Sequence, residues 1–569
     1  MNSKIAPPRL RRSFLRIAWS GAGIACAGVA FATALPTATS ANPPSRAFAA
    51  LPQTRIPATL RNVRRGRMTA PAPCTTNYPG ASFVGIAGQR DIAAGEDSAV
   101  LGGYSNNACA EFSGVGTGYL NSANVAGSFV GGGGYVTYAD GHAFGNQASG
   151  QDAFVGAGDV NSAYGDGSFV GAGGVYYEGL GSGFSPGNAA GGTDSFVGAG
   201  DINGVAADLA FIGNGYDNTI ASTGYESVIV GGADNLINAS GVFVGGGSGN
   251  DATATGGVIG GGADNNENGS YGVVAGGHGN VAGGAGAFVG AGGSASHGNS
   301  ASGVDAFAGA GDQNSAAGTE SFVGGGSGNV SSGNFGFLGA GINNTVAQEA
   351  TYGALLGGNK NNVGAQYAVV LGGYANYASA PYAVIAGGDQ NAASGTLSFA
   401  AGYNADAVHN GSFVWSDYSS GSALAKDTAS NQFVVRASGG VTLYSNEAMS
   451  AGVSLPAGSG TWTSLSDRNA KTAIEPLDDA SVLAKVTALP VSTWRYKTES
   501  GVRHVGPMAQ DFYAAFGVGE DSRHITSIDE DGVALAAIKA LASKIGKLEG
   551  ENAQLRARLT AVESKVARH

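Results

Sequence analysis

Two side chains capable of covalent chemistry lie five positions apart near the C-terminal end of the chain. They are Ser466 and Lys471, in the stretch WTSLSDRNAKTAIEPL at residues 461–476. A serine hydroxyl is a weak nucleophile until an adjacent base takes its proton. A lysine is such a base only where burial or nearby cations lower its pKa towards neutrality. The pair suggests serine–lysine chemistry on a neighbouring peptide bond, and a Ser-Asp turn beside a solvated lysine is the alternative.

The composition of the chain changes abruptly just before this pair. Of 569 residues, 100 are glycine and only 12% are charged, and most of the glycine lies upstream of residue 461. The glycines follow no G-X-Y period, which excludes collagen, and 43% hydrophobic residues is too many for a disordered linker. We therefore expect an ordered, repetitive, β-rich fibre upstream of the pair.

A short repeat fills residues 81–410, in variants such as SFVGGGSGN, VIGGGADN and FLGAGINN. The residue before the glycine run recurs at steps of 14, 15, 15 and 15, at Val230, Val244, Ile259, Val274 and Val289. A fixed short period predicts a solenoid. Each unit of about 15 residues is expected to hold two short strands and two turns, one rich in glycine and the other centred on asparagine.

Asparagine recurs six residues after the reference position, at Asn161, Asn203, Asn218, Asn250, Asn265, Asn280, Asn314, Asn329 and Asn344. We expect these residues to adopt the left-handed turn conformation and to hydrogen-bond to one another along the axis. One such coil buries few apolar side chains, and its glycines are costly to order. Lateral association of identical chains would supply the missing burial.

The repeats resemble the head repeats of trimeric autotransporter adhesins. That resemblance implies left-handed parallel β-rolls packed in threes. Residues 411–460 break the period and are predicted to form a β-rich neck, with Trp415, Phe433 and Tyr444 as its packing residues. Calcium-binding nonapeptide repeats and a phosphate-binding glycine loop do not fit, because neither the aspartate spacing nor a GxxxxGK[ST] motif is present.

The region downstream reads as a small domain at 461–535 and a coiled coil at 536–569. A helical pattern at 478–489 precedes a strand at 492–497. The final segment has a heptad seam, with apolar residues spaced alternately by three and four and Asn552 at one a position. The seam consists of Ile538, Leu541, Ile545, Leu548, Asn552, Leu555, Leu559, Val562 and Val566.

Several motifs in this region resemble the C-terminal intramolecular chaperone domain of endosialidase-type phage tailspikes. They are Ser466-Asp467 with Lys471, TWRYK at 493–497, GPMAQD at 506–511 and DGVALAAIKAL at 531–541. The resemblance implies a domain that trimerises, guides folding of the upstream fibre and then cuts itself off with a Ser466–Lys471 dyad acting in cis only. It favours cleavage between Ser466 and Asp467, with Leu465–Ser466 as the second choice.

The expected fold class is therefore mainly β. It comprises a homotrimeric left-handed parallel β-roll or solenoid fibre, then a small α+β chaperone domain that ends in a parallel coiled coil. The expected function is an adhesin-like surface fibre matured by self-cleavage. A polysaccharide-binding or polysaccharide-degrading tailspike-like enzyme is the alternative, although no carboxylate pair stands out in the repeats.

The N-terminal residues 1–41 predict an export signal, with a basic start, a weakly apolar stretch and small residues before a cleavage point. Arg11-Arg12 resembles a twin-arginine signal. Residues 42–80, rich in proline and arginine, are expected to be a linker. In an oxidising compartment Cys74 and Cys109 either pair as a disulfide or stay as two buried free thiols. The expected location is secreted or on the surface of a Gram-negative-type bacterium.

Charge limits the expected partners. Residues 1–67 carry 11 of the 29 lysines and arginines, so the remainder holds 18 basic against 41 acidic residues. Such an acidic body argues against nucleic acid and anionic lipid as partners. We expect the chain itself, as a homotrimer, and an unidentified surface ligand such as a glycan. No cofactor, no metal and no membrane span after signal removal are expected.

Overall fold

The computed structural model describes residues 74, 83–84, 88–134, 136–137, 143–174, 187–418 and 423–568. The predicted export signal at 1–41 lies outside these residues. So does the predicted linker at 42–80, apart from Cys74. The description below concerns the solenoid and the C-terminal region, each by itself.

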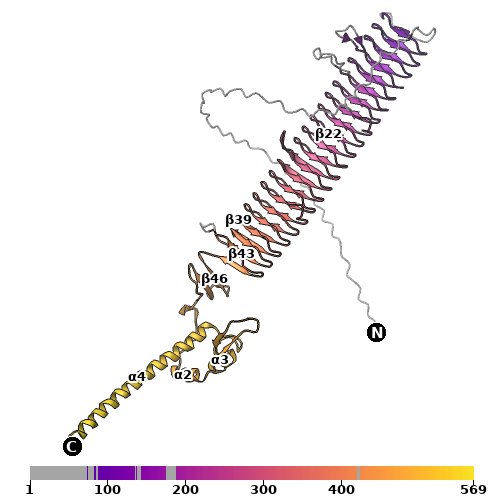
Figure 1. Ribbon diagram of the computed structural model, residues 1–569. Helices are drawn as coiled ribbons and strands as arrows, with labels where there is room; N and C mark the ends of the chain where they lie inside the picture. Colours follow the sequence, from indigo (N-terminus) through magenta and orange to yellow (C-terminus); the bar gives the residue numbers. More distant parts are fainter. Residues whose placement is uncertain are drawn as a thin grey trace, which may run out of the picture. The chain divides into compact units, whose positions relative to one another are not determined.

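The described part of the repeat region is a solenoid of two parallel sheets (Figure 1). The first sheet is 22-stranded and runs from β1 (Phe83–Val84) to β45 (Phe433–Arg436). The second runs from β2 (Ile92–Ala93) to β44 (Ala425–Lys426), and most strands in both sheets have two residues. Successive coils are in register at 15 residues, as in β21 (Phe243–Val244) and β23 (Val258–Ile259), where Phe243 pairs with Val258. The mainly β fold and the 15-residue period are confirmed.

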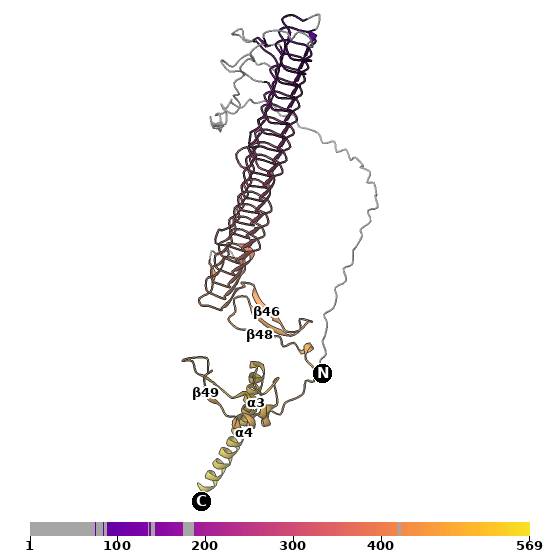
Figure 2. The same ribbon diagram turned by 90° about the vertical axis from the view of Figure 1, so that its right-hand side faces the viewer.

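The core is a narrow column of side chains inside the coils, whose stacked backbone is shown in Figure 2. The second residue of each strand points inward, because side chains alternate across a strand. In the first sheet this residue is usually Val, Ile or Leu, such as Val244 and Ile259, and in the second it is often alanine, such as Ala252 in β22 (Asp251–Ala252). All three are fully buried. Each coil therefore contributes only a few apolar side chains to the core.

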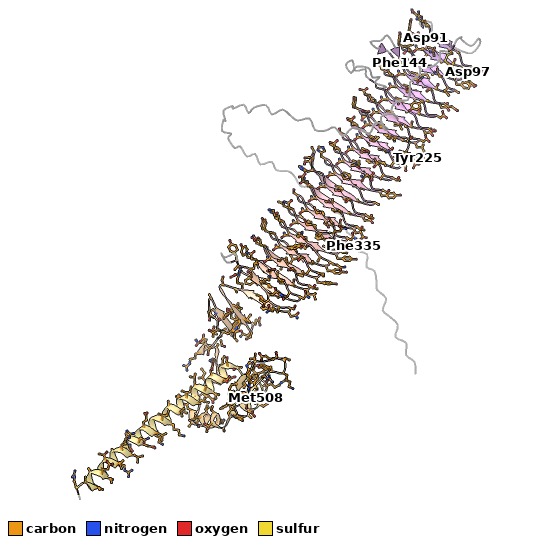
Figure 3. The ribbon with its side chains drawn as sticks, in the orientation of Figure 1. Asp91, Asp97, Phe144, Tyr225, Phe335 and Met508 are labelled. Carbon is orange, nitrogen blue, oxygen red and sulfur yellow. A yellow bond between two sulfur atoms is a disulfide. The ribbon has the colours of Figure 1, made fainter. Side chains whose placement is uncertain are left out.

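The two connections of a coil differ from the expected pair of turns. The glycine run and the asparagine belong to one connection, since Gly245 to Asn250 join β21 to β22. The other connection, from Thr253 to Gly257, leads back to the first sheet. Asp97, Tyr225 and Phe335 belong to connections of this second kind and lie along one edge of the solenoid (Figure 3). The prediction of separate glycine and asparagine turns was therefore wrong.

The repeated asparagines lie inside the coils and link each coil to the next. Asn250 is fully buried, and its backbone N–H and its Nδ2 both donate to Oδ1 of Asn235 in the preceding coil, at 3.1 and 2.9 Å. The same Nδ2 also donates to the carbonyls of Gly246 and Gly262. The expected bonding between stacked asparagines is confirmed. The left-handed residue, however, is the one before each asparagine, as at Asp264 before Asn265 with φ 52°.

Glycine in this connection is required by close approach of neighbouring coils. Gly247 has a φ of 92°, and a Cβ there would lie 1.9 Å from the carbonyl oxygen of Gly262. The register also corrects one sequence assignment. Ile229, not Val230, occupies the core and pairs with Val244, so the apparent step of 14 is a step of 15.

Glu267 is an exception to the apolar core. It is the second residue of β24 (Asn266–Glu267), where neighbouring coils place alanine, and it is fully buried. Gly257 and Gly272 make room for the side chain, because a Cβ at Gly257 would lie 1.9 Å from Glu267 Oε2. The carboxyl oxygens have no hydrogen-bond partner. Burial raises the pKa of Glu267 to about 7, although nearby backbone groups act to lower it.

The solenoid extends further than the predicted boundary at residue 410. β41 (Phe399–Tyr403), β43 (Phe413–Ser416) and β45 continue the parallel first sheet to Arg436. A three-stranded antiparallel sheet follows, formed by β46 (Gly440–Tyr444), β47 (Gly452–Pro456) and β48 (Thr463–Ser464). The predicted packing residues of the neck, Trp415, Phe433 and Tyr444, are all exposed. In the single chain they pack no core.

The C-terminal region is a small α+β unit. It contains α2 (Asp479–Ala488), a hairpin of β49 (Ser492–Trp494) and β50 (His504–Gly506), α3 (Ala509–Phe516) and α4 (Ser527–Val566). Its core is small and centres on Val482 of α2 against Ala536 and Ala537 of α4. The expected boundary at 535/536 falls inside α4, which is one continuous helix of 40 residues.

The buried carboxyl group predicts a pH-dependent stability. The unfolded chain ionises Glu267 above about pH 4.5, whereas the folded chain keeps it protonated up to about pH 7. Its contribution to stability is present below pH 4.5 and is lost as the pH rises through 7. We expect the thermal midpoint of wild type, measured relative to that of Glu267→Gln, to decrease as the pH is raised from 5 to 8. The corresponding loss in the free energy of unfolding is ~1–3 kcal/mol. Identical pH profiles of the two proteins in calorimetry would contradict this assignment.

Candidate active site

Ser466 and Lys471 flank a short helical turn that follows the antiparallel sheet. β48 ends at Ser464, and the N–H of Leu465 still donates to the carbonyl of Gly452 at 3.2 Å. Asp467 then caps a 3₁₀ turn at Arg468–Ala470, and its Oδ1 accepts the N–H of Asn469 at 2.9 Å. A carboxylate is a favoured cap because it satisfies N–H groups that the turn leaves free. Asp467 therefore has a structural role beside its predicted place at the cleavage point.

This turn brings the two predicted catalytic side chains together. Lys471 Nζ donates a hydrogen bond to Ser466 Oγ at 2.6 Å. A nucleophile and its base must lie within about 2.6–3.2 Å for proton transfer. The geometry therefore allows Lys471, once neutral, to take the hydroxyl proton of Ser466.

The surroundings of the pair are open in the single chain. Ser466, Asp467 and Lys471 are all exposed. The pair therefore has the spacing of a dyad without the burial that would activate it. Any activation must come from groups that cover the site.

The other motif residues form the scaffold of the region. Trp494 of the TWRYK segment stacks on His504 across the hairpin, with ring centroids 4.7 Å apart, and His504 Nε2 lies 2.8 Å from Glu499 Oε2. Met508 of the GPMAQD segment precedes α3 (Figure 3). In the DGVALAAIKAL segment Ala536 and Ala537 pack on α2, as described above. These motifs build the scaffold of the domain, and only the Ser466–Lys471 motif supplies nucleophilic chemistry.

A large share of the apolar residues in this region is exposed. The exposed set includes Ile474, Leu477, Val491, Tyr496 and Val505 as well as the apolar seam of α4. A soluble monomer rarely leaves so much apolar surface uncovered. The region therefore leaves a large apolar surface uncovered in the single chain.

A disulfide joins Cys74 to Cys109, with Cα atoms 5.9 Å apart. Cys109 directly follows β4 (Asn107–Ala108), so the bond ties the segment at residue 74 to an early coil. Within the described residues, no group of three His, Cys, Asp or Glu side chains is arranged to hold a metal ion. None of the described helices combines the length and the apolar character needed to cross a bilayer.

Part of the C-terminal region matches a known protein family. Residues 466–518 match the model of the family described as chaperone of endosialidase, and the match begins at Ser466 itself. A search of curated proteins found no match to the chain. Residues 466–518 are thus similar to the chaperone domain of endosialidases, and they follow a long β-solenoid. This combination defines a tailspike- or fibre-like protein with an intramolecular chaperone, and the family implies that the chaperone domain cleaves itself.

Substitutions at the dyad test its chemistry. We expect Ser466→Ala and Lys471→Arg to leave the chain uncut, because the first removes the nucleophile and the second keeps a cation that cannot lose its proton. Loss of the base should slow cleavage by ~100-fold or more. The measurement is the fraction of cut chain over time on a denaturing gel.

Ser464→Ala is the matched control, since Ser464 is an exposed serine two positions away in β48. It should cut at the wild-type rate. Cleavage of Ser466→Ala at that rate would show that Ser466 is not the nucleophile.

Proposed function

We propose that this protein is an exported, homotrimeric, adhesin-like surface fibre. Its C-terminal domain drives trimer folding and is then released by autoproteolysis through Ser466 and Lys471. The observation that carries the proposal is the 2.6 Å contact between Lys471 Nζ and Ser466 Oγ, at the residue where the family match begins. The dyad acts in cis, and no activity on other substrates is proposed.

Trimerisation is supported by the seam of α4. The eight apolar residues of the seam are between 47% and 70% exposed in the single chain. A helix with such an apolar stripe packs it against a partner. Apolar residues that recur every 3.5 residues on average let identical helices pack along their whole length in a coiled coil. Asn552 sits among these residues, and a polar residue at one a position sets the register of a parallel coiled coil.

Assembly would also activate the dyad. Because Ser466 and Lys471 are exposed in one chain, cleavage requires that neighbouring chains bury the site and lower the pKa of the base. Cleavage would then follow folding instead of preceding it. This order protects the fibre, because the C-terminal domain is released only after the coils have folded.

Two bonds are open to the nucleophile. Attack of Ser466 Oγ on the carbonyl carbon of Leu465 closes a five-membered ring, breaks the Leu465–Ser466 bond and leaves an ester that water hydrolyses. Attack of the same oxygen on its own carbonyl closes a strained four-membered ring. Cleavage between Ser466 and Asp467, which the family resemblance favours, therefore needs a water molecule activated by the dyad. The N-terminal residue of the released fragment distinguishes the two routes.

Export is supported by the predicted signal at residues 1–41 and by the Cys74–Cys109 disulfide. Disulfides persist in oxidising compartments and are rare in the cytosol. The acidic body favours a soluble surface that repels other acidic surfaces. We propose a secreted or cell-surface location in a Gram-negative-type bacterium and a glycan or host surface as the ligand.

Seam variants test whether assembly and cleavage are coupled. Leu555→Glu should abolish the trimer and, with it, self-cleavage, because three carboxylates cannot be buried together at a d position. Gln554→Glu adds the same charge one residue away, outside the seam, and should leave both intact. Molar mass by light scattering and the fraction of cut chain are measured on the same samples. Normal cleavage by a monomeric Leu555→Glu protein would contradict the coupling.

A further inference from the structure

The outer face of the first sheet carries a continuous apolar column, which we call the phenylalanine face. It is formed by the first residue of each strand and by the residue two positions later. Neighbouring rings stack along the axis, as between Phe169 and Phe196 at 4.8 Å and between Phe307 and Phe322 at 4.9 Å. The phenylalanines of this face are Phe129, Phe154, Phe169, Phe196, Phe211, Phe243, Phe288, Phe307, Phe322, Phe337, Phe399, Phe413 and Phe433.

Coils without phenylalanine keep the same surface apolar in another way. Most of the rings lie beside a glycine two positions later, and a Cβ at Gly198 would lie 3.3 Å from Cε1 of Phe196. Where the first residue is smaller, an exposed apolar side chain takes the place of that glycine in four coils. These pairs are Ala99 with Leu101, Val228 with Val230, Ala354 with Leu356, and Val369 with Leu371. A large apolar group therefore occupies the same patch in most coils, by two different routes. The coils that begin at Gly114, Val258, Val273 and Val384 have only small apolar residues there.

The phenylalanine face is also free of charge. From Ala99 to Gly402, the four residues that begin at each strand of the first sheet include no Asp, Glu, Lys or Arg. Acidic residues stand in the connections instead, as at Asp201, Asp234 and Asp264. The second sheet differs, because its outward residues are often polar, such as Asn107 and Ser315. The apolar character belongs to one side of the solenoid.

Stacking within one chain accounts for only part of this pattern. A ladder of aromatic pairs stabilises adjacent strands by ~0.2–1 kcal/mol each. It explains neither the leucine and valine residues that replace the rings nor the absence of charge along the whole face. The face is half-buried to exposed along its length, and a contiguous apolar patch of this extent marks an interaction surface. Because the rings are nearly parallel, with 3° between Phe169 and Phe196, they present edges and not open faces to a ligand.

We infer that the phenylalanine face is the surface along which copies of this chain pack side by side, parallel and in register. A partner that covers a face repeating once per coil over the whole first sheet needs the same repeat and the same length, and another copy of the chain has both. The body is acidic, so copies approach most favourably through a side that bears no charge. This inference rests on the proposed trimer and adds which side of the solenoid faces its axis.

Cysteine substitutions in two coils test the inference in the full-length chain. Phe307 lies on the phenylalanine face, and Ser315 is the outward residue of the second sheet in the same coil, in β30 (Ser315–Ala316). Val230 is an exposed residue of the same face, two positions after Val228, so Val230→Cys probes the face without loss of a ring. Cys74 and Cys109 are already paired with each other.

Under mild oxidation, Phe307→Cys and Val230→Cys should form covalent dimers in most chains on a non-reducing denaturing gel. Ser315→Cys should stay monomeric on that gel, and reduction should abolish the dimers. Linkage of Ser315→Cys alone would overturn the inference. Absence of linkage in all three variants, with a trimeric mass by light scattering, would also overturn it while leaving the proposed trimer intact. A monomeric mass for wild type would instead reject the trimer itself.

Discussion

The hydrogen bonding between successive coils is the constraint on which the rest of this structure depends. Backbone N–H and C=O groups pair at a register of 15 residues, and a buried asparagine in most coils bonds to the asparagine of the coil before it. This column satisfies polar groups that would otherwise be left unpaired inside a narrow solenoid. At one end of the described ladder Asp91 replaces asparagine and accepts from both the N–H and the Nδ2 of Asn106.

The same constraint limits what a single chain can achieve. Glycine is needed where coils approach closely, as at Gly247, so the connections contribute almost no apolar surface. The core is left with a few small side chains per coil, and the larger aromatic residues point outward. Repetition also makes neighbouring registers similar in energy, so slippage by one coil costs little. Long-range parallel pairing is also slow, because distant segments must be brought together before their contacts stabilise them. A separate element that fixes the register at one end, such as α4 with its seam, would remove both difficulties.

The fold was largely predictable from the sequence because its period is regular. The 15-residue unit, the two short strands and the stacked asparagines follow from recurring residue types. What the sequence did not reveal was how the residues divide between the two connections. Glycine and asparagine favour turns equally well, so Asn250 was predicted as a turn residue although it is a buried partner of Asn235. The end of the solenoid was placed too early because the coil that spans Phe413 to Phe433 is longer than 15 residues.

The candidate site was predictable in part. The spacing of Ser466 and Lys471 suggested a pair, and the Asp467 cap explains how a short turn brings them to 2.6 Å. The exposure of the pair was not predictable, because burial depends on packing that a local motif does not encode. The exposed site, the exposed seam of α4 and the uncharged phenylalanine face all lack covering groups in the single chain. Association of identical chains would provide those groups for all three.

The central claim is that the C-terminal domain winds the fibre before it is released. The most direct measurement compares the full chain with a chain that ends at Ser466, both produced in the same exporting host. Protease resistance and molar mass of the solenoid are determined for each. Our account predicts resistant trimers from the full chain, and protease-sensitive or aggregated material from the truncated chain. Equal yields of resistant trimers from both would contradict it.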